Sequence, residues 1–401
     1  MNTDVLVIGG GPCGSYAAMT AASLGSRVAV CEEHREVGVP KHCAGHISVS
    51  GFGRLNLAPP PESIENEIMG AHIYSPAGRE FSLRLERPVT YVINRELFDR
   101  HLMETAKKSG VEYFFGTKVR SLSTQGNSGR CVVEHEGGAD SFSSKMVIDA
   151  EGSSANLLRR ADLPVPDPAN MVSAAQVEAD GAEIESDDMV EVYLTKKYAP
   201  GLFAWIIPKR DGTSKIGLAT NTGNPSQKLK DFMKEHPVAS KKLRSVALSK
   251  PSIHLIPLGG VMRKIHHPGL LVVGDAASQV KPTTGGGVIF GLTCARIAGE
   301  VAHEALSKGD FSERLLSSYQ SKCEEAIGFD LSAMRKIRRR MDKMSDEKMD
   351  KIFGIWNKFG VTRALEKAGD LDYQGRSLLK VAGSPKALMG LAYSFLWALF
   401  P

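Results

Sequence analysis

A glycine-rich segment near the start of the chain constrains the fold more strongly than any other part of the 401-residue sequence. Residues 9–14 read Gly-Gly-Gly-Pro-Cys-Gly and match the pattern G-x-G-x-x-G. The largely apolar run 4–8 precedes them and an alanine-rich stretch at 15–24 follows, which predicts a buried strand, a tight turn and a helix. A further strand is predicted at 27–32. Strand, turn, helix and strand within about thirty residues are typical of a βαβ unit with parallel strands.

Three glycines of this segment have separate physical roles in binding a dinucleotide. Gly9 permits the tight turn, Gly11 lets the backbone approach a pyrophosphate, and Gly14 allows the helix to pack closely on the strand. The free N–H groups at the start of the helix would bind the phosphates. Glu32, at the end of the second strand, can bind both ribose hydroxyls, which favours FAD or NAD over NADP. The alternative is a glycine-rich turn without a ligand.

A second glycine-rich segment, far along the chain, distinguishes these two cofactors. An apolar run at 269–273 leads to Asp275, and Gly286 and Gly287 precede a further predicted helix that begins at Val288. An aspartate there can hold a ribityl chain, and glycine amides at a helix start can face the pyrimidine end of a flavin. FAD is long enough to reach this second segment, whereas NAD dehydrogenases do not need it. The segment therefore favours FAD, and the alternative is a glycine-rich helix cap without a catalytic role.

The segments between and after these motifs predict how the rest of the chain is organised. Residues 190–194, 202–207 and 215–219 are β-rich and separated by turn signals, which indicates an antiparallel sheet. From 311 onward the chain is charged and helical in pattern. The predicted fold class is α/β (α+β overall), with a Rossmann-like FAD-binding domain, an interleaved antiparallel-sheet substrate domain and a C-terminal helical region. The expected ranges are 1–70, 94–165 and 260–310 for the FAD-binding domain, 71–93 and 166–259 for the substrate domain, and 311–401 for the helical region.

Composition and charge narrow the class of protein and its compartment. Hydrophobic residues make up 42% and charged residues 24% of the sequence, ordinary values for a globular enzyme that argue against disorder and a coiled coil. The formal net charge of +5, without a basic stripe interleaved with aromatics, argues against nucleic-acid binding. Six scattered cysteines without CxxC spacing favour a reduced protein. We expect a cytoplasmic location, since neither a signal peptide nor an apolar run of about 18–20 residues is evident.

Three further segments carry a resemblance to a known family. Residues 38–48 read Gly-Val-Pro-Lys-His-Cys-Ala-Gly-His-Ile-Ser, residues 203–209 read Phe-Ala-Trp-Ile-Ile-Pro-Lys, and residues 149–154 read Asp-Ala-Glu-Gly-Ser-Ser. Together with the two glycine-rich segments, they resemble the flavoprotein group that includes para-hydroxybenzoate hydroxylase. Within that group the chain is most similar, over nearly its whole length, to the geranylgeranyl reductase family and its archaeal digeranylgeranylglycerophospholipid reductases.

The resemblance implies which residues contact the cofactor and which contact the substrate. FAD contacts would fall on Gly14, Glu32, Cys43, Ala44, His46, Arg95, Val119, Asp275, Gly287 and Val288, in addition to Gly9, Gly11 and Gly286 of the glycine patterns. The strand with Phe203, Trp205, Ile207 and Pro208 would wall an apolar tunnel for a prenyl chain, and Lys209 at its end is a further candidate for substrate binding. The sequence departs from the family pattern at His46, Ile207 and Glu151, where many members have glycine, phenylalanine and aspartate.

Cys43 and His46 are the candidate catalytic residues. Cys43 follows a glycine–proline turn and, over the isoalloxazine ring, can act in proton or electron transfer; a small packing residue is the alternative. A zinc site built from His42, Cys43 and His46 is not expected, because these crowded ligands lack a distant fourth one. Trp205 is also consistent with an ordinary core residue. Lys209 fits either a contact to a polar head group or a solvated side chain.

The function that the resemblance implies is an FAD-dependent reductase that saturates double bonds of geranylgeranyl chains in archaeal-type glycerol ether phospholipids. The alternatives are an aromatic hydroxylase, a pigment-side-chain geranylgeranyl reductase and a non-catalytic flavin redox partner. No second Rossmann unit is evident, so we expect an external electron donor, which would be a ferredoxin-like protein, reduced deazaflavin or NAD(P)H.

Two features near the C-terminus suggest a peripheral contact with the cytoplasmic face of a membrane, where the prenylated glycerolipid substrate would reside. Basic residues crowd the helical stretch 335–343. Leu388, Leu391, Phe395 and Leu399 share one helical stripe. A solvated helix face is the alternative for the basic stretch.

Overall fold

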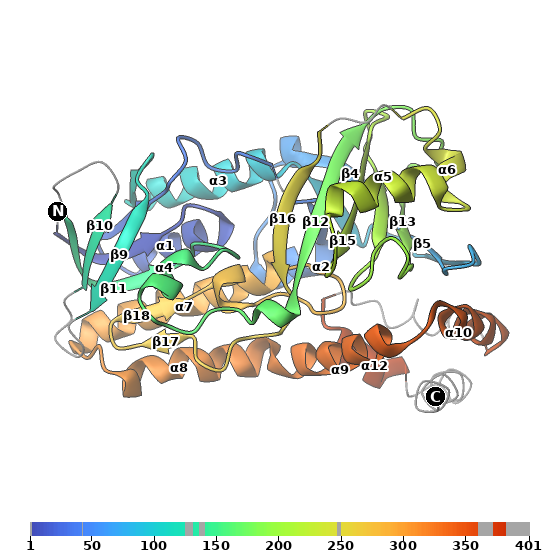
Figure 1. Cartoon of the computed structure of the whole chain (residues 1–401). Helices are drawn as coiled ribbons and strands as arrows, with labels where there is room; N and C mark the ends of the chain where they lie inside the picture. The colour runs from blue at the N-terminus through green and yellow to red at the C-terminus, as the bar shows by residue number, and fades with distance from the viewer. Residues whose placement is uncertain are drawn as a thin grey trace. The chain divides into compact units, whose positions relative to one another are not determined.

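The computed structural model describes residues 2–41, 43–124, 131–135, 141–246, 250–359 and 372–381 (Figure 1). Its contacts divide the chain into two compact units, each assembled from segments that are far apart in the sequence. Unit 1 comprises Met1–Lys41, Arg95–Asn170 and Pro257–Leu331, and unit 2 comprises His42–Asn94, Met171–Ile256 and Ser332–Pro401.

Unit 1 is built on a sheet whose central strands are parallel. Its described strands are β1 (Asn2–Ile8), β2 (Val28–Cys31), β8 (Glu112–Phe114), β9 (Val119–Thr124), β10 (Cys131–His135), β11 (Ser141–Asp149), β17 (His266–His267) and β18 (Leu270–Val272). The order is β17-β18-β11-β1-β2-β8, and the β9–β10 hairpin extends antiparallel from β11. β1 pairs in parallel with β2 and with β11, and β11 pairs in parallel with β18. The predicted βαβ unit and the parallel strand before Asp275 are therefore confirmed.

The helices of unit 1 pack closely because small residues lie at their contacts. Its described helices are α1 (Pro12–Ser23), α3 (Arg95–Lys108), α4 (Asn156–Arg160), α7 (Val288–Lys308) and α8 (Glu313–Cys323). α1 begins at Pro12, whose fixed φ suits the first turn of a helix. α7 packs against α1, and a Cβ at Gly299 would lie 2.7 Å from the Ala17 oxygen and from the Thr20 Cβ. The two helices thus approach each other backbone to backbone.

Unit 2 contains a largely antiparallel sheet in the order β16-β12-β15-β14-β13-β5-β6. The strands are β5 (Gly70–Tyr74), β6 (Glu80–Arg84), β12 (Met171–Ala179), β13 (Met189–Tyr193), β14 (Ala204–Pro208), β15 (Ser214–Thr220) and β16 (Ser252–Pro257). The predicted antiparallel pairing of 190–194, 202–207 and 215–219 is confirmed. β13 and β5 are parallel, however, because β5 belongs to an earlier chain segment and joins the edge of β13 through a long connection.

A second, three-stranded sheet and several helices complete unit 2. The sheet has the order β3-β7-β4, with β3 (His46–Ser48), β7 (Thr90–Ile93) and β4 (Ile64–Ile68) antiparallel. The described helices are α2 (Val49–Leu55), α5 (Pro225–Glu235), α6 (Ala239–Lys242), α9 (Phe329–Lys343), α10 (Asp346–Phe359) and α12 (Gln374–Val381). α8 and α9 follow each other through a π-helical turn, Glu324–Gly328. The predicted helical character of the chain after 311 is thus confirmed for the described residues.

The larger sheet of unit 2 buries an apolar core on one face. Ala204 and Ile206 of β14 belong to this core together with Tyr193 of β13 and Phe232 of α5, all of them buried. Side chains alternate between the two faces along a strand. Trp205 and Ile207 of β14 therefore project from the opposite face.

This opposite face, the Trp205 face, is defined by the register of β14 and β15. Trp205 pairs with Gly217, and Ile207 pairs with Lys215. Directly paired residues of antiparallel strands project to the same side of a sheet, so these four share one face. An apolar wall and a lysine therefore lie side by side on the Trp205 face.

The boundaries of the two compact units differ from the domain boundaries expected from the sequence. Residues 42–70, expected with the FAD-binding domain, belong to unit 2, and 311–331, expected with the C-terminal helical region, belong to unit 1. The long helix α7 and the strands before it explain the second difference, since α8 packs back onto α7 and β17.

Leu388, Leu391, Phe395 and Leu399, predicted to share one helical stripe, lie outside the described residues. Within the described ranges, none of the helices combines the length and apolar character needed to cross a bilayer.

Candidate active site

The glycine-rich turn follows β1 directly and fixes the start of α1. Gly9 has a φ of +96°, which favours glycine, and its N–H donates to the carbonyl of Cys31 at 2.8 Å. A Cβ at Gly14 would collide with the carbonyl oxygen of Gly9, so α1 can approach the turn only because residue 14 has no side chain. At Gly11, by contrast, no atom of the described residues beyond its chain neighbours lies within 4 Å of a Cβ position. The turn therefore keeps an open face at Gly11.

Glu32 brings a buried carboxylate to the end of β2. One of its oxygens accepts the Gly10 N–H at 2.6 Å, and the other accepts the His34 N–H at 2.9 Å. The oxygen that accepts the His34 N–H also lies 2.7 Å from Nδ1 of His34, whereas the oxygen bound to Gly10 can accept a further hydrogen bond from a ribose hydroxyl. The Thr117 N–H donates to the Glu32 carbonyl at 2.8 Å, which brings Val119, the first residue of β9, to the same end of the sheet.

The second glycine-rich segment meets the first one at Cys13. The Cys13 sulfur lies 3.0 Å from a Cβ position at Gly274 and 2.5 Å from a Cβ position at Gly291 of α7. A Cβ at Gly287, just before α7, would lie 3.0 Å from an oxygen of Asp275. Burial, with the negative charge of Asp275, raises the pKa of Cys13 to about 12, so this thiol is a neutral packing group. The two glycine-rich segments, which are far apart in the sequence, thus lie next to each other in unit 1.

Arg95 begins α3 and is held by a bidentate ion pair. Its Nε and Nη2 atoms donate to the two carboxylate oxygens of Asp99 at 2.8 and 2.9 Å. The two side chains are only 15% and 5% exposed. Burial raises the pKa of Asp99, and the charge of Arg95 opposes that rise. The same guanidinium acts electrostatically on the Cys13 thiol, which places it on the side of α3 that faces the glycine-rich turn.

The segment after β11 holds another buried carboxyl. Asp149 is fully buried, and burial together with the charge of Glu151 raises its pKa well above the ordinary value. Glu151 accepts the N–H groups of Leu157 and Leu158 at 2.8 and 3.0 Å, so its carboxylate binds the first turn of α4. The glutamate that departs from the family pattern is therefore committed to a helix N-terminus.

The loop with Cys43 lies in unit 2 and leads into β3. The Gly45 N–H donates to the Cys43 sulfur at 3.3 Å, and the Gly45 carbonyl accepts the Ile93 N–H at 2.8 Å. A Cβ at Gly45 would collide with the Ile93 backbone, so this close approach requires glycine. Nε2 of His46 lies 2.5 Å from the Thr90 hydroxyl. The C-terminal end of the loop is thus fastened to β7.

The residues beside Gly45 are accessible in part. Cys43 and Ala44 are half-buried, and His42 lies outside the described residues. In the part of the chain that the structure describes, no group of histidine, cysteine and carboxylate side chains is arranged to hold a metal ion.

The strand predicted to contact the substrate is mostly buried. The Trp205 Nε1–H donates to the Gln176 side-chain oxygen at 3.1 Å, and its ring covers Gly217, where a Cβ would lie 2.5 Å from it. The half-buried Phe203 ring meets the Trp205 ring edge-on, with centroids 6.1 Å apart. Ile207 is buried on the same face. Pro208 ends the strand and is also buried.

Lys209 is enclosed by carboxylates. Its Nζ lies 3.4 Å from Glu65, 3.2 Å from Glu178 and 3.3 Å from Asp211. The side chain is 9% exposed, so the alternative of a solvated lysine is wrong. An ammonium that already faces three carboxylates is also poorly suited to bind an anionic head group, and the structure gives Lys209 a different neighbourhood from the one expected.

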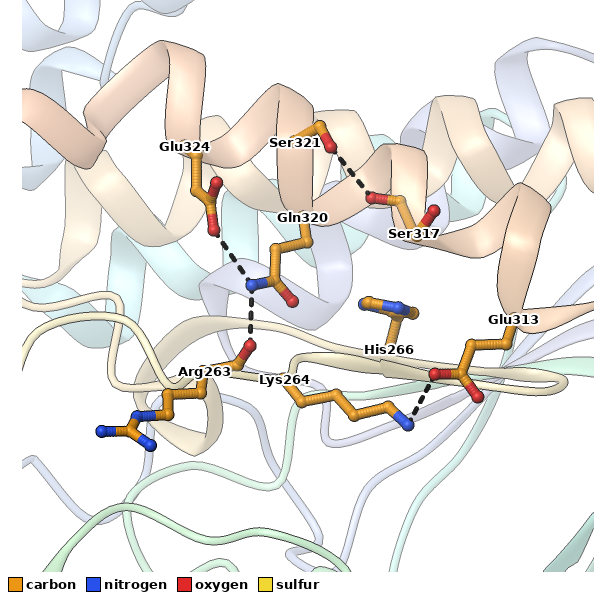
Figure 2. Close-up of a pocket in the computed structure, with 8 residues that line it drawn as sticks. All are labelled: Arg263, Lys264, His266, Glu313, Ser317, Gln320, Ser321 and Glu324. Carbon is orange, nitrogen blue, oxygen red and sulfur yellow. Dashed lines mark hydrogen bonds and ion pairs between the residues drawn. The ribbon is translucent and has the colours of Figure 1, made fainter.

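A polar cavity of about 300 Å³ lies elsewhere in unit 1 (Figure 2). Its lining residues are Arg263, Lys264, His266, Glu313, Ser317, Gln320, Ser321 and Glu324. Lys264 pairs with Glu313 at 2.7 Å, and the Gln320 amide donates to the Arg263 carbonyl at 2.7 Å and to Glu324 at 3.0 Å (Figure 2). The polar groups of the cavity therefore bind one another, and the lining contains none of the predicted site residues.

Sequence reasoning did not single out three residues that contact the predicted site residues. Asp99 had a usable signal, because it follows Arg95 at the i,i+4 spacing of a predicted helix. Lys215 was visible only as a lysine within an otherwise apolar strand. Glu65 had no signal, since only the fold brings β4 beside the end of β14.

Comparisons with known proteins agree with these features. The family model of the FAD binding domain matches residues 2–328. The chain is 32% identical to digeranylgeranylglycerophospholipid reductase 2 of Methanopyrus kandleri over 95% of each chain. It is 33% identical to digeranylgeranylglycerophospholipid reductase of Methanocaldococcus jannaschii, over 87% of this chain and 89% of the relative.

A solved structure of similar fold extends the comparison. A geranylgeranyl bacteriochlorophyll reductase-like protein from Thermoplasma acidophilum has a TM-score of 0.86 and 26% identity, over 98% of this chain and 99% of that one. Parallel sheet, glycine-rich turn and matching family model together define an FAD-binding flavoprotein. Within that class, the chain belongs to the geranylgeranyl reductase family, among the digeranylgeranylglycerophospholipid reductases.

Replacing Arg95 by glutamine should lower the free energy of unfolding, because it leaves the buried Asp99 carboxylate without a partner. The variant Arg95→Gln leaves this carboxylate without its guanidinium, and we expect a loss of about 3–5 kcal/mol in the free energy of unfolding at neutral pH. Without Arg95 the pKa of the buried Asp99 rises further, so the loss should be full above the pKa of Asp99 in the variant and disappear as the pH falls below its raised pKa in the wild type. Urea denaturation with excess FAD at several pH values measures the effect.

Two controls separate the buried pair from a general effect on α3. In the double variant Arg95→Gln/Asp99→Asn the buried group is neutral, so most of the lost stability should return. Arg100 forms an exposed pair with Glu96 on the same helix, and Arg100→Gln should cost less than about 1 kcal/mol. A double variant that is no more stable than Arg95→Gln alone would contradict this account.

Proposed function

We propose that the chain is an FAD-dependent reductase that saturates carbon–carbon double bonds in the geranylgeranyl chains of archaeal-type glycerol ether phospholipids. The observation that carries the proposal is an FAD-binding fold combined with similarity to digeranylgeranylglycerophospholipid reductases over most of the chain. The partly accessible Cys43 loop and the aromatic strand of unit 2 support it, because they offer a reactive loop and an apolar wall.

The residues of unit 1 fit FAD. The open face at Gly11 suits close approach of a pyrophosphate, and the Glu32 carboxylate has acceptor capacity left for ribose hydroxyls. We assign FAD binding in unit 1 to Gly9, Gly11, Gly14, Glu32, Arg95, Val119, Asp275, Gly286, Gly287 and Val288. In unit 2 we assign it to Cys43, Ala44 and His46.

The chemistry divides between the cofactor and the protein. FAD, when bound and reduced, supplies a hydride to one carbon of the alkene. The chain must hold the alkene in place, exclude water and deliver a proton to the other carbon. We assign the wall of the prenyl chain to Phe203, Trp205, Ile207 and Pro208. Cys43 and His46 are assigned to the reacting centre, where the Gly45 N–H contacts the Cys43 sulfur and His46 contacts the Thr90 hydroxyl.

The electron donor is proposed to be external. The family model and the described strands give unit 1 a dinucleotide-binding βαβ unit at 2–31, which the FAD occupies in this proposal. A ferredoxin-like protein, reduced deazaflavin or NAD(P)H would then dock transiently.

The proposed reaction is tested directly on a lipid. Chemically reduced, FAD-loaded protein is mixed without oxygen with a geranylgeranylated glycerol ether phospholipid, and the products are examined by mass spectrometry. We expect mass gains that correspond to one added H₂ per reduced double bond, together with reoxidation of the flavin. Geranylgeranylated chlorophyll serves as a parallel substrate, because preferential reduction of the pigment would favour the pigment reductase. If the flavin stays reduced and the masses of both substrates stay unchanged, the proposal is refuted.

Gly11→Ala should weaken FAD binding without damage to the fold. A methyl group at this position meets open space in the protein but would contact a pyrophosphate, so we expect FAD affinity to fall at least about tenfold, or 1.4 kcal/mol. Quenching of flavin fluorescence on binding measures the affinity, and thermal unfolding without added FAD checks the fold. Gly53→Ala in α2, which also meets open space, is the matched control and should bind FAD normally. Unchanged affinity in Gly11→Ala would show that the pyrophosphate lies elsewhere.

We further propose that α9 contacts an anionic membrane surface. Arg335, Lys336, Arg339 and Lys343 are exposed, and their spacing places them along one side of the helix. Within the described ranges none of these four has an ion-pair partner, whereas the buried Arg338 pairs with Asp342 at 3.0 Å. The four exposed residues, the α9 basic stripe, therefore carry uncompensated positive charge.

The α9 basic stripe is tested with vesicles. Replacement of its four residues by glutamine should weaken binding to phosphatidylglycerol-containing vesicles by about 1 kcal/mol for each residue. The effect should fade as salt is raised, because salt screens exposed charges. The matched control removes four other exposed basic residues, Lys108, Lys230, Lys234 and Arg244. Equal weakening in both variants would assign the binding to net charge rather than to the stripe.

A further inference from the structure

A buried lysine on the Trp205 face has no evident role in a hydrocarbon-binding wall. Lys215 lies opposite Ile207 in the β14–β15 pair, and Trp205 lies opposite Gly217 two residues away. The Lys215 side chain is 3% exposed. Burying an ammonium is costly, and an apolar residue of similar size would often stabilise such a site as well or better. A charge retained next to an apolar wall therefore calls for a chemical explanation.

The ammonium of Lys215 has two partners from the three-stranded sheet. Its Nζ lies 2.6 Å from a carboxylate oxygen of Glu65 in β4, and it donates to the carbonyl of Ile93 in β7 at 3.3 Å. The N–H of the same Ile93 donates to Gly45, next to Cys43 in the proposed reacting loop. Lys215 is thus bound to the strand that also fastens the Cys43 loop.

Glu65 links Lys215 to a second lysine and through it to the surface. Its other oxygen lies 3.4 Å from Nζ of Lys209, which in turn lies 3.2 Å from Glu178 and 3.3 Å from Asp211. The exposed fraction rises from 9% at Lys209 to 42% at Glu178 and 58% at Asp211. The result is a continuous row of alternating acids and bases that runs from solvent to a fully enclosed ammonium.

Burial by itself disfavours the charged form of Lys209, but the charges of Glu65, Glu178 and Asp211 outweigh it and raise the pKa of Lys209. The ammonium therefore stays protonated at neutral pH even though it is buried. The row therefore keeps a protonated lysine between Glu65 and the exposed carboxylates.

We propose that Lys215 is the proton donor for alkene reduction and that Glu65 and Lys209 return a proton to it from the surface. The inference rests on the proposed function. As hydride from the reduced flavin forms a C–H bond at one alkene carbon, the π bond breaks and its electron pair takes a proton from Lys215 at the other carbon. The flavin is oxidised, the alkene is reduced, and Lys215 is left as a neutral amine. A proton from solvent, passed through Lys209 and Glu65, restores the ammonium.

The variant Lys215→Arg distinguishes a proton donor from a lysine that only forms a structural ion pair. A guanidinium keeps the charge and can still pair with Glu65, but it does not release its proton. Reduced, FAD-loaded protein is mixed with geranylgeranylated lipid, and flavin reoxidation is followed in a single turnover. We expect the rate to fall roughly a hundredfold or more, with FAD content and lipid binding unchanged. A structural pair predicts a rate close to that of the wild type.

The matched control is another buried lysine of unit 2. Lys242 lies 2.7 Å from the buried Glu191 but belongs to the opposite, Tyr74 side of the sheet, with its Nζ 3.0 Å from the Tyr74 hydroxyl. Lys242→Arg should leave the single-turnover rate unchanged. Equal slowing in both variants would indicate general damage to unit 2 and overturn the assignment of Lys215.

A second variant covers the case in which arginine does not fit. Lys215→Ala, supplied with small primary amines of differing acidity, should recover rate, and the recovered rate should depend on the pKa of the amine. Glu65→Gln keeps a similar shape but cannot carry a proton, so repeated turnover should slow more than the first one. If the recovered rate does not depend on the pKa of the amine, or if Lys215→Arg is as fast as the wild type, the inference is overturned but the proposed function is not. A wild type that leaves the lipid unreduced overturns the proposed function and the inference with it.

Discussion

Backbone contact without intervening side chains is the constraint on which unit 1 depends. α1 reaches the end of β1 only because Gly14 has no Cβ, and α7 reaches α1 at Gly299 for the same reason. Cys13 then fills the space between the first glycine-rich turn and Gly291 of α7. Because protein interiors are close-packed, a shift at any of these contacts would displace the others. The two glycine-rich segments are therefore held as one preformed unit, which suits a long cofactor that must be bound at several points.

Both faces of the larger sheet in unit 2 carry a buried and paired lysine. On the side of the apolar core, Lys242 is paired with the buried Glu191, the Tyr74 hydroxyl and the exposed Glu185. On the Trp205 face, the pair of Lys215 and Glu65 continues through Lys209 to exposed carboxylates. Both arrangements satisfy the requirement that a buried charge be paired. Only the second lies on the Trp205 face, where Lys215 is next to Ile207 and bound to the strand that also holds the Cys43 loop.

The sequence alone was sufficient for features that depend on local pattern. The strand at 4–8, the glycine turn and the parallel pairing of β1 and β2 follow from hydrophobic period and glycine spacing, and the structure confirms them. Long-range pairing was harder, because nothing local predicts that β5 joins β13 in parallel or that residues 42–70 belong to unit 2. The surroundings of Lys209 were unpredictable for the same reason, since Glu65 and Glu178 come from separate parts of the chain and only Asp211 is near Lys209 in the sequence. The roles of the individual site residues remain predictions.

The need for an internal proton source follows from the kind of reaction proposed. An isolated alkene is scarcely polarised, so its reduction depends on alignment inside an apolar site from which water is excluded. Each saturated bond nevertheless consumes a proton, and exclusion of water removes the usual source. An apolar wall must then be interrupted by at least one proton carrier that is connected to solvent. On the Trp205 face, the interruption at Lys215 is next to Ile207 and leads through Glu65 and Lys209 to the surface, which is the arrangement that such a reaction requires.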